Sequence, residues 1–384
     1  MAKILHVVNI FFVVPYFIGR QFDYFNEKGH EMFLICSPSE HLLNFSKEMH
    51  FKYKEIHIER AFSPFLDFIS LLKIVVFIKR NNIDIIVGHT PKGALLAMMS
   101  GFICGVATRI YFRHGIVYET MIGKQKALMI WMDRFTSYLA TKVICVSNSV
   151  MDKSNIDKLC DYRKQAVLGS GSCGGIDTKS KFNPKKIKNN KLLDYRNKLN
   201  ISMDSFVIGY VGRLVKDKGI IELVVAFERI LMSESNVILL LVGDFEKRDA
   251  LPSEIRNKII LSSKIIKTGF IHTDIEYYYK MMNVFILPSY REGFPISVLE
   301  ASAMQLPIIT TKSTGCVESI IENTTGIFTE ISSEAIYDAI LNIKKNNYNM
   351  GKKGRSFVVK NFDHSVIFPQ IESIYLDKFN ENKK

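Results

Sequence analysis

The sequence predicts an α/β protein built from two doubly wound parallel sheets. The chain has 384 residues, which is the length of about two domains of ordinary size. Short apolar runs rich in β-branched residues alternate with longer helical patterns along most of its length. Such runs lack a polar face, which is typical of strands buried on both sides in a parallel sheet covered by helices.

The first half of the chain carries five strand patterns and two clear helical patterns. The expected strands are Ile4–Asn9, Met32–Cys36, Ile83–Gly88, Arg109–Arg113 and Lys142–Ser147, and the expected helices include Phe65–Asn81 and Pro91–Cys104. The apolar start of the chain also resembles a signal peptide. Because Asn9 and Pro15 interrupt it and no small-residue cleavage site follows, we expect a buried strand instead.

The second half repeats the alternation after a break. The expected strands are Phe206–Gly212, Val237–Gly243, Ile265–Gly269, Val284–Pro288 and Pro307–Thr311, and the expected helices are Ile220–Met232, Asp274–Met281, Ile296–Met304 and Ala335–Lys345. Between the halves, residues 169–200 are rich in Gly and Lys and are interpreted as an exposed linker. We therefore expect domains at 1–180 and 181–362, and a C-terminal helix at 363–384 that packs back on the first domain.

Composition excludes several classes of protein. Hydrophobic residues make up 47% of the chain, too many for a disordered chain. The net charge of +13 favours anionic partners. No nucleic-acid-binding motif accompanies this charge, so nucleic acid is not expected as a partner. The six cysteines show no C-x-x-C spacing, which argues against a zinc site and indicates a reduced, cytoplasmic protein.

Doubly wound sheets bind ligands at the carboxyl ends of their strands, so the residues that follow the strands are the candidates. With two such domains, we expect the site in the cleft where the two sets of strand ends face each other. In the second domain Gly212 and Arg213 end one strand, and Lys218 precedes a helix. Two cations beside a helix N-terminus suit a diphosphate. Solvated loop charges are the alternative interpretation.

Two further strand ends in the second domain carry glycine. Gly243 ends the strand that follows the helix at 220. Phe270 and Ile271 come directly after Gly269, where backbone groups can approach a flat base. A Phe270 side chain buried in the core is the alternative interpretation.

The most specific pattern is a pair of carboxylates eight residues apart. Glu292 lies on an expected loop, whereas Glu300 lies on the following helix. The backbone around Gly293, Phe294 and Pro295 opens that helix and suits a phosphate or sugar oxygen. A carboxylate such as Glu300 suits a vicinal diol, as in ribose recognition. The alternative is a helix capped by Glu292 with Glu300 on its outer face.

These motifs, in this order and spacing, resemble the retaining GT-B glycosyltransferases of family four. The resemblance rests on Gly212-Arg213, Lys218-Gly219, Gly269-Phe270 and Glu292-x7-Glu300, and in the first half on Gly88–Gly93, Arg113-His114-Gly115, Val146–Ser149 and Gly174–Asp177. The pattern is similar to the bacterial subgroup that builds capsule, O-antigen and related surface glycans. It implies two Rossmann-like domains that face each other across a cleft.

The resemblance also implies roles for the site residues. Arg213 and Lys218 would bind the donor diphosphate, and Glu300 would bind the ribose hydroxyls. Glu292 and the backbone of residues 293–295 would hold the donor sugar. The remaining donor-side positions would be Gly19, Gly212 and Gly243. The backbone of Phe270 and Ile271 would read the base.

The first domain is expected to supply His114, which would lie over the donor sugar. Without the resemblance, His114 is still a polar ring at the end of an apolar strand, where catalytic groups are found. A structural loop histidine is the alternative, and His89 shares the position on a neighbouring strand. The family's first loop often has a Gly-Gly pair, and Gly19-Arg20 is the nearest equivalent here.

The implied reaction moves a sugar from a nucleotide-sugar, expected to be UDP-linked, to a hydroxyl of a glycan or lipid-linked sugar. Fixed cations and helix N–H groups stabilise the leaving diphosphate. Because the sequence has no Asp-x-Asp motif, we expect neither a metal nor another cofactor. Retention is implied by the resemblance alone. Whether Glu292 is a nucleophile or positions the sugar stays open, and a nucleotide-sugar epimerase of GT-B architecture is the alternative function.

One expected helix of the first domain carries both apolar and basic side chains and suggests where the protein meets its acceptor. Residues 65–80 combine many apolar side chains with Lys73, Lys79 and Arg80. Together with the net charge, this predicts peripheral docking on the cytoplasmic face of an anionic inner membrane. A helix buried in a soluble protein is the alternative.

Overall fold

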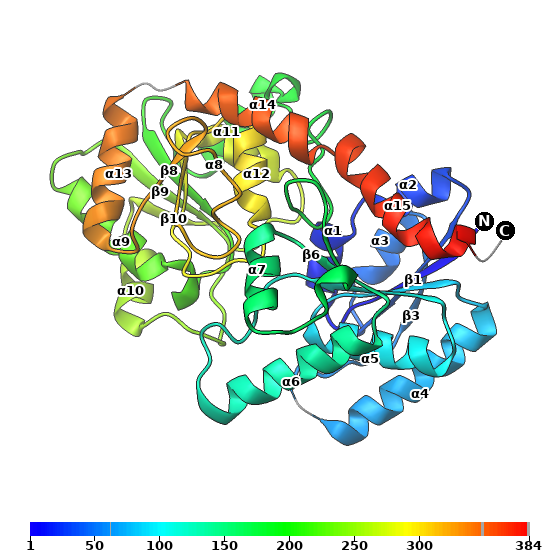
Figure 1. Cartoon of the computed structure of the whole chain (residues 1–384). Helices are drawn as coiled ribbons and strands as arrows, with labels where there is room; N and C mark the ends of the chain where they lie inside the picture. The colour runs from blue at the N-terminus through cyan, green and yellow to red at the C-terminus, as the bar shows by residue number, and fades with distance from the viewer. Residues whose placement is uncertain (62, 347–348, 382–384) are drawn as a thin grey trace. The chain divides into compact units, whose positions relative to one another are not determined.

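The computed structural model describes residues 1–61, 63–346 and 349–381, which form two compact units (Figure 1). The N-terminal unit comprises Met1–Gly175 and His364–Lys384, and the C-terminal unit comprises Ile176–Asp363. The division after Gly175 comes five residues before the boundary expected at 180, and the second division follows Asp363 rather than residue 362.

The N-terminal unit is built on a parallel sheet of seven strands in the order β3-β2-β1-β4-β5-β6-β7. Its strands are β1 (Lys3–Val7), β2 (Glu31–Cys36), β3 (Lys52–Glu55), β4 (Ile85–Gly88), β5 (Thr108–Arg113), β6 (Lys142–Cys145) and β7 (Gln165–Val167). Five of them match the expected runs. The strands β3 and β7 were not expected, because they lie at the sheet edges and carry polar residues instead of a buried apolar run.

Helices connect these strands. They are η1 (Phe11–Val13), α1 (Val14–Phe17), α2 (Gln21–Glu27), α3 (Leu42–Glu48), α4 (Pro64–Asn81), α5 (Pro91–Ile103), α6 (Gly123–Leu139), α7 (Asn148–Ile156) and η2 (Tyr162–Lys164). The last helix of the chain, α15 (His364–Glu381), belongs to this unit and lies beside α2 (Figure 1). There Tyr24 donates a hydrogen bond to Glu372 at 2.5 Å, and Tyr375 stacks on Phe25.

The C-terminal unit has a parallel sheet of six strands in the order β10-β9-β8-β11-β12-β13. Its strands are β8 (Phe206–Val211), β9 (Val237–Val242), β10 (Ile265–Lys267), β11 (Val284–Leu287), β12 (Ile308–Thr310) and β13 (Gly326–Phe328). Its helices are η3 (Pro184–Lys186), α8 (Asn189–Lys198), η4 (Lys216–Lys218), α9 (Ile220–Leu231), α10 (Ser253–Leu261), α11 (Ile275–Met281), α12 (Ile296–Ala303), α13 (Ser333–Lys345) and α14 (Met350–Phe362). Every residue of β9 is buried, as expected for a central strand covered on both faces.

The prediction of an exposed linker at 169–200 was wrong. The helix α8 lies within that segment and packs against α11. Its Arg196 is buried and donates a hydrogen bond to the carbonyl of Met281, and the Tyr195 ring contacts Tyr278. The Lys-rich composition predicted solvation, but helical periodicity turns one face of α8 inward.

No helix in the described part of the chain is both long enough and apolar enough to cross a bilayer. All six cysteines are free thiols.

Candidate functional site

The loop after β8 carries the predicted cations of the C-terminal unit. The chain runs from Gly212 and Arg213 through η4 to Gly219, which begins α9 with φ of +68°. A Cβ atom at Gly219 would lie 2.1 Å from the carbonyl oxygen of Pro288. Only glycine permits this contact, and it presses the Lys218 loop against the loop that follows β11.

That contact brings Lys218 and Glu292 together although they are 74 positions apart in the sequence. The Nζ of Lys218 lies 2.5 Å from Oε1 of Glu292, and their side chains are 12% and 15% exposed. The backbone N–H of Glu292 also donates to the carbonyl of Thr314 at 3.0 Å, which fixes the loop. The two residues therefore form a positioned ion pair that solvent still reaches.

Arg213 is the second predicted cation in the loop after β8. Its Nη1 lies 3.1 Å from Oε2 of Glu246, and both side chains are partly exposed. Burial alone would lower the pKa of the Arg213 guanidinium, but the Glu246 carboxylate raises it above its ordinary value. Glu246 was not singled out from the sequence, because no motif contains it and only the fold brings it to Arg213.

The predicted glycines Gly212 and Gly243 follow β8 and β9, and the fold itself explains why glycine stands there. Gly212 and Gly243 have φ of +152° and +154°, and a Cβ at Gly243 would lie 1.8 Å from the carbonyl oxygen of Gly212. The loops after β8 and β9 thus touch through their backbones. Gly243 is required for this contact, whereas a Cβ at Gly212 would lie 2.8 Å from the Tyr210 hydroxyl oxygen. A contact of either glycine with a ligand stays a prediction.

Glu300 lies on α12 and is buried, with 7% of its surface exposed. The hydroxyl of Tyr279 donates a hydrogen bond to its Oε2 at 2.7 Å. Burial raises the pKa of Glu300 to about 7, although the Tyr279 hydrogen bond acts in the opposite direction. The alternative with Glu300 on the outer face was therefore wrong. Tyr279 on α11 was missed because a tyrosine in an amphipathic helix carries no separate signal.

The segment between the two carboxylates has mixed exposure. Pro295 is the N-cap of α12 and no side chain caps the helix, so the alternative in which Glu292 is the cap was wrong. The Phe294 side chain is buried against Phe362, with ring centroids 5.4 Å apart. The carbonyl of Gly293 lies close to Gly315. The side chain of Phe294 is therefore closed to a ligand, and this residue could contact one only through its backbone.

The residues expected to read a base lie after β10. Gly269 adopts φ of +75°, and the side chain of Phe270 is 42% exposed. The alternative of a core Phe270 was therefore wrong. Ile271 is partly exposed beside it. Their role in binding a base stays a prediction.

In the N-terminal unit, His114 follows β5 and His89 follows β4. Nε2 of His114 lies 2.9 Å from Nδ1 of His89, and Phe17 stacks on the His114 ring with centroids 3.7 Å apart. Burial lowers the pKa of His114 to about 3, so the ring is uncharged at neutral pH. Gly19, at φ of +49°, closes the turn after α1 that holds Phe17, and its Cβ would meet the carbonyl of Pro15.

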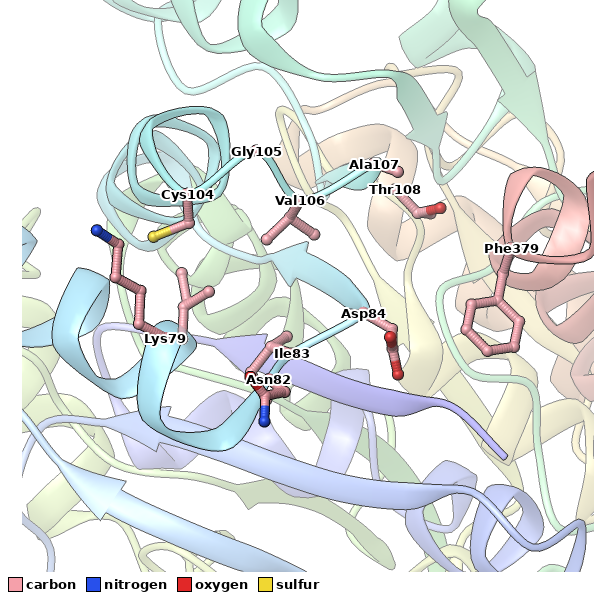
Figure 2. A pocket seen from close by; sticks show the side chains of 11 residues that line it. Lys79, Asn82, Ile83, Asp84, Cys104, Gly105, Val106, Ala107, Thr108 and Phe379 are labelled. Carbon is pink, nitrogen blue, oxygen red and sulfur yellow. The ribbon is translucent and has the colours of Figure 1, made fainter. Parts of the chain in front are cut away.

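A hollow of about 550 Å³ in the N-terminal unit lies away from these residues. Figure 2 shows its lining, in which Lys79, Cys104 and Phe379 come from α4, the end of α5 and α15. Asp84 and Thr108 place it at the amino-terminal ends of β4 and β5. His89 and His114 lie at the opposite ends of the same strands, so this hollow is not the predicted site.

Comparison with known proteins supports one family for both units. The family of group 1 glycosyl transferases matches residues 193–357, and the glycosyl transferase 4-like family matches residues 3–147. The capsular polysaccharide biosynthesis glycosyltransferase CapM of Staphylococcus aureus is 31% identical over 378 residues, which cover 97% of this chain and 96% of CapM. The chain belongs to the family-four glycosyltransferases.

A second relative agrees in sequence, and a solved structure agrees in fold. A UDP-Gal:alpha-D-GlcNAc-diphosphoundecaprenol alpha-1,3-galactosyltransferase of Escherichia coli is 25% identical over 93% of this chain and 92% of its own length. The crystal structure of Anabaena Alr3699/HepE in complex with UDP and glucose superposes with a TM-score of 0.80 at 18% identity, covering 97% of this chain and 99% of HepE. The expected GT-B fold of two parallel-sheet α/β domains is confirmed.

Within this glycosyltransferase, the fold brings the predicted residues together in part. In the C-terminal unit Lys218 and Glu292 are in direct contact, whereas Arg213 and Glu300 each contact a residue that the sequence analysis did not name. In the N-terminal unit His114 contacts the expected neighbour His89. A third histidine, His6, contacts His89 from β1 and was not named as a site residue.

Proposed function

We propose that this glycosyltransferase moves a hexose or N-acetylhexosamine from a UDP-sugar to a hydroxyl of a lipid-linked sugar during synthesis of a surface polysaccharide. The Lys218–Glu292 pair carries the proposal, because it sets a cation for a departing diphosphate beside a carboxylate for sugar hydroxyls. The E. coli relative, whose name gives a UDP-galactose donor and a diphosphoundecaprenol acceptor, supports this choice of substrates.

The proposed chemistry rests on charge that develops when the glycosidic bond breaks. Negative charge grows on the oxygens of the leaving diphosphate, and Lys218 and Arg213 stabilise it. Each of these cations pairs with one carboxylate and stays partly exposed. A phosphate can therefore approach the cation and interact with it alongside that carboxylate. We propose a reaction that retains the anomeric configuration and needs no metal ion.

Glu292 is proposed to position the donor sugar. One oxygen of this carboxylate lies 2.5 Å from an ammonium group, so it is engaged in an ion pair and is poorly placed to attack as a nucleophile. Its second oxygen can still accept a hydrogen bond from a sugar hydroxyl. The acceptor hydroxyl then loses its proton to the leaving phosphate.

The proposal is tested with a panel of nucleotide-sugars, measuring thermal stabilisation and slow donor hydrolysis with and without EDTA. A UDP-sugar should stabilise the protein most, and EDTA should leave hydrolysis unchanged. The variant E292Q should keep most of its donor affinity and lose turnover. Formation of an epimer from donor alone, without sugar release, would instead establish the epimerase alternative.

We also propose that α4 docks on an anionic membrane, where a lipid-linked acceptor is found. One face of α4 packs in the core through Leu71, Ile74 and Ile78. The alternative interpretation of a buried helix therefore holds for this face only. The opposite face leaves large apolar side chains exposed, namely Phe65, Leu66, Phe68, Leu72 and Val76. Exposed Lys73, Lys79 and Arg80 lie on the same helix. Apolar side chains flanked by basic ones suit the surface of an anionic bilayer.

Vesicle co-sedimentation tests this docking. The protein should bind vesicles containing phosphatidylglycerol at low salt and should not bind neutral phosphatidylcholine vesicles. The double variant F65S/F68S should weaken binding, whereas the matched variant L43S, at an exposed leucine on α3, should not. Equal binding of the two variants would discard this helix as the docking surface.

A further inference from the structure

One tyrosine of the C-terminal unit reaches the buried carboxylate of Glu300 from a separate helix. The hydroxyl of Tyr279, on α11, donates a hydrogen bond to Oε2 of Glu300, on α12, at 2.7 Å. The two residues are 21 positions apart in the sequence, so the packing of α11 on α12 creates this contact. Glu300 lies one turn inside α12, which follows the loop at the carboxyl end of β11. The contact therefore lies near the edge of the sheet at which a doubly wound fold binds its ligand.

The ring of Tyr279 is fixed in the core. Its side chain is fully buried. The ring packs edge-on against Phe182 and at a tilt against Phe285, with centroids 6.1 Å and 5.8 Å apart. A ring packed on both of these sides cannot follow a moving carboxylate without losing those contacts. Tyr279 therefore presents its hydroxyl to Glu300 from a fixed point.

Two charged residues also act on Glu300. Glu276 lies one turn before Tyr279 on α11 and raises the pKa of Glu300, whereas the exposed Lys181 lowers this pKa. The helix α14 also packs on α12, but its Arg355 donates to three backbone carbonyls and its lysines are exposed to solvent. The strands β11 and β12 contain no ionisable residue. The hydrogen bond from Tyr279 is thus a directed contact in a setting where the other charges act without one.

The ionised carboxylate of Glu300 is the form that suits a vicinal diol. This form has no proton to give, so Tyr279 is necessarily the donor in the contact. Each carboxylate oxygen accepts more than one hydrogen bond, and the Tyr279 hydroxyl therefore leaves acceptor sites for two sugar hydroxyls. The hydrogen bond also favours the charged form of Glu300, because it lowers the pKa that burial raises. Tyr279 acts on both the direction and the charge of the carboxylate.

We propose that Tyr279 is a positioning residue that holds the Glu300 carboxylate in place for the ribose diol of the donor nucleotide. Because Tyr279 is fully buried, it acts through Glu300 and not on the ligand. This role rests on the proposed function, which supplies the nucleotide. Loss of the one hydroxyl should weaken the preference of the protein for ribose over a sugar without the diol. A tyrosine that only stabilises the fold would leave this preference unchanged.

Calorimetric titration with UDP and with 2′,3′-dideoxy-UDP tests this role. The ratio of the two dissociation constants measures the preference for the diol, and the titration of the diphosphate cancels because both nucleotides carry it. At pH 8 the wild type should prefer UDP about thirtyfold, and Y279F should lower this ratio by about threefold or more, as expected for hydrogen bonds to a charged group. Y277F is the matched control. It removes a hydroxyl from the same helix, where Tyr277 contacts Tyr195, and should keep the wild-type ratio.

The pH dependence of the same ratio reports the charge of Glu300. In the wild type the ratio should rise as the pH passes about 7, the pKa to which burial raises Glu300. In Y279F this rise should move to higher pH, because the hydrogen bond that favours the charged form is absent. E300Q should lower the ratio and flatten the profile. The double variant Y279F/E300Q should match E300Q, because the two residues act as one unit.

Several outcomes would overturn the proposal. The first is a wild-type ratio and pH profile in Y279F, even where its thermal stability falls. Loss of folding in Y279F, with Y277F folded, would assign the hydroxyl a purely structural role and would also overturn it.

Failure of the proposed function has a separate signature, because in that case no nucleotide binds to the wild type. Carbon NMR of the ¹³C-glutamate-labelled protein without nucleotide then decides the role of Tyr279, with E300Q identifying the carboxyl signal of Glu300. The titration of this signal should move to higher pH in Y279F and stay in place in Y277F. An unchanged titration in Y279F would exclude Tyr279 as a positioning residue.

Discussion

Each unit places a cation near the carboxyl ends of its strands, but the two cations are held in different ways. Arg113, the last residue of β5, is fully buried and donates hydrogen bonds to Asp133, Ser137 and Ser154 at 2.6–2.7 Å. It also reaches Gln165. Lys218 in the C-terminal unit has the Glu292 carboxylate beside it and remains partly exposed.

The difference shows which cation can serve a ligand. The Nη1 and Nη2 donors of Arg113 bind groups of its own unit, and exchanging those groups for a ligand would leave a buried charge without its partners. Lys218 can share its charge with an incoming phosphate, because its pair is reached by solvent. A charged residue at a strand end is therefore a site residue only where its partners leave it accessible.

The largest expected effect comes from breaking the buried pair of the N-terminal unit. The variant D133A leaves Arg113 as an uncompensated buried charge, so the free energy of unfolding should fall by about 3–5 kcal/mol. Urea unfolding measures this change. The variant R163A, which breaks the exposed pair with Asp161, is the control and should leave stability nearly unchanged. An equal loss of unfolding free energy in the two variants would show that burial does not determine the cost of breaking an ion pair.

The second prediction concerns the accessible cation. K218A should lower the turnover number about a hundredfold, because one fixed charge at a developing anion is removed. It should also weaken UDP binding while changing thermal stability little. Lys216 is exposed in the same short helix, so K216A is the matched control. Equal activity loss in both variants would contradict a specific role for Lys218.

The third prediction is a dependence of stability on pH that comes from Glu300. Burial raises its pKa to about 7 in the folded state, above the ordinary value of 4.5. The folded protein therefore holds a proton that the unfolded chain releases, and this contribution to stability is complete below pH 4.5 and is lost as the pH rises to about 7. The loss should amount to at most about 3 kcal/mol.

The variant E300Q isolates this contribution, since glutamine does not titrate. Urea unfolding at pH 5 and pH 8 should show a smaller difference for E300Q than for the wild type. Lys181 and Glu276 also act on Glu300, so E276Q serves as a comparison that keeps the titrating group. An identical pH slope in wild type and E300Q would exclude Glu300 as the source.

The smallest expected effect separates the roles of the two units. H114A should lower turnover about tenfold, because it removes one uncharged hydrogen-bonding ring from the end of β5. Its affinity for UDP, measured by calorimetry, should stay unchanged, in contrast to K218A. A loss of UDP affinity in H114A as large as that in K218A would contradict this division of roles.

How far the sequence predicts this molecule depends on the kind of signal. The central strands were predicted well because they are continuous apolar runs, as in β9. The edge strand β3 and the helix α8 were missed because their polar residues suggest solvation. The Glu292-x7-Glu300 motif led to the correct loop and helix, but it gave no indication that Tyr279 would bond to Glu300.

The sequence alone determined the alternation of strands and helices, the two-sheet architecture and the residue types at the strand ends. These features depend on local patterns of hydrophobicity and on spacing along the chain. Only the tertiary structure decided which charges are accessible and which polar groups pair. The pairs Lys218 with Glu292 and Arg113 with Asp133, and the contacts of His89 with His6 and His114, join residues that are not neighbours in the sequence. Such contacts follow from the packing of parallel strands, which no local pattern encodes.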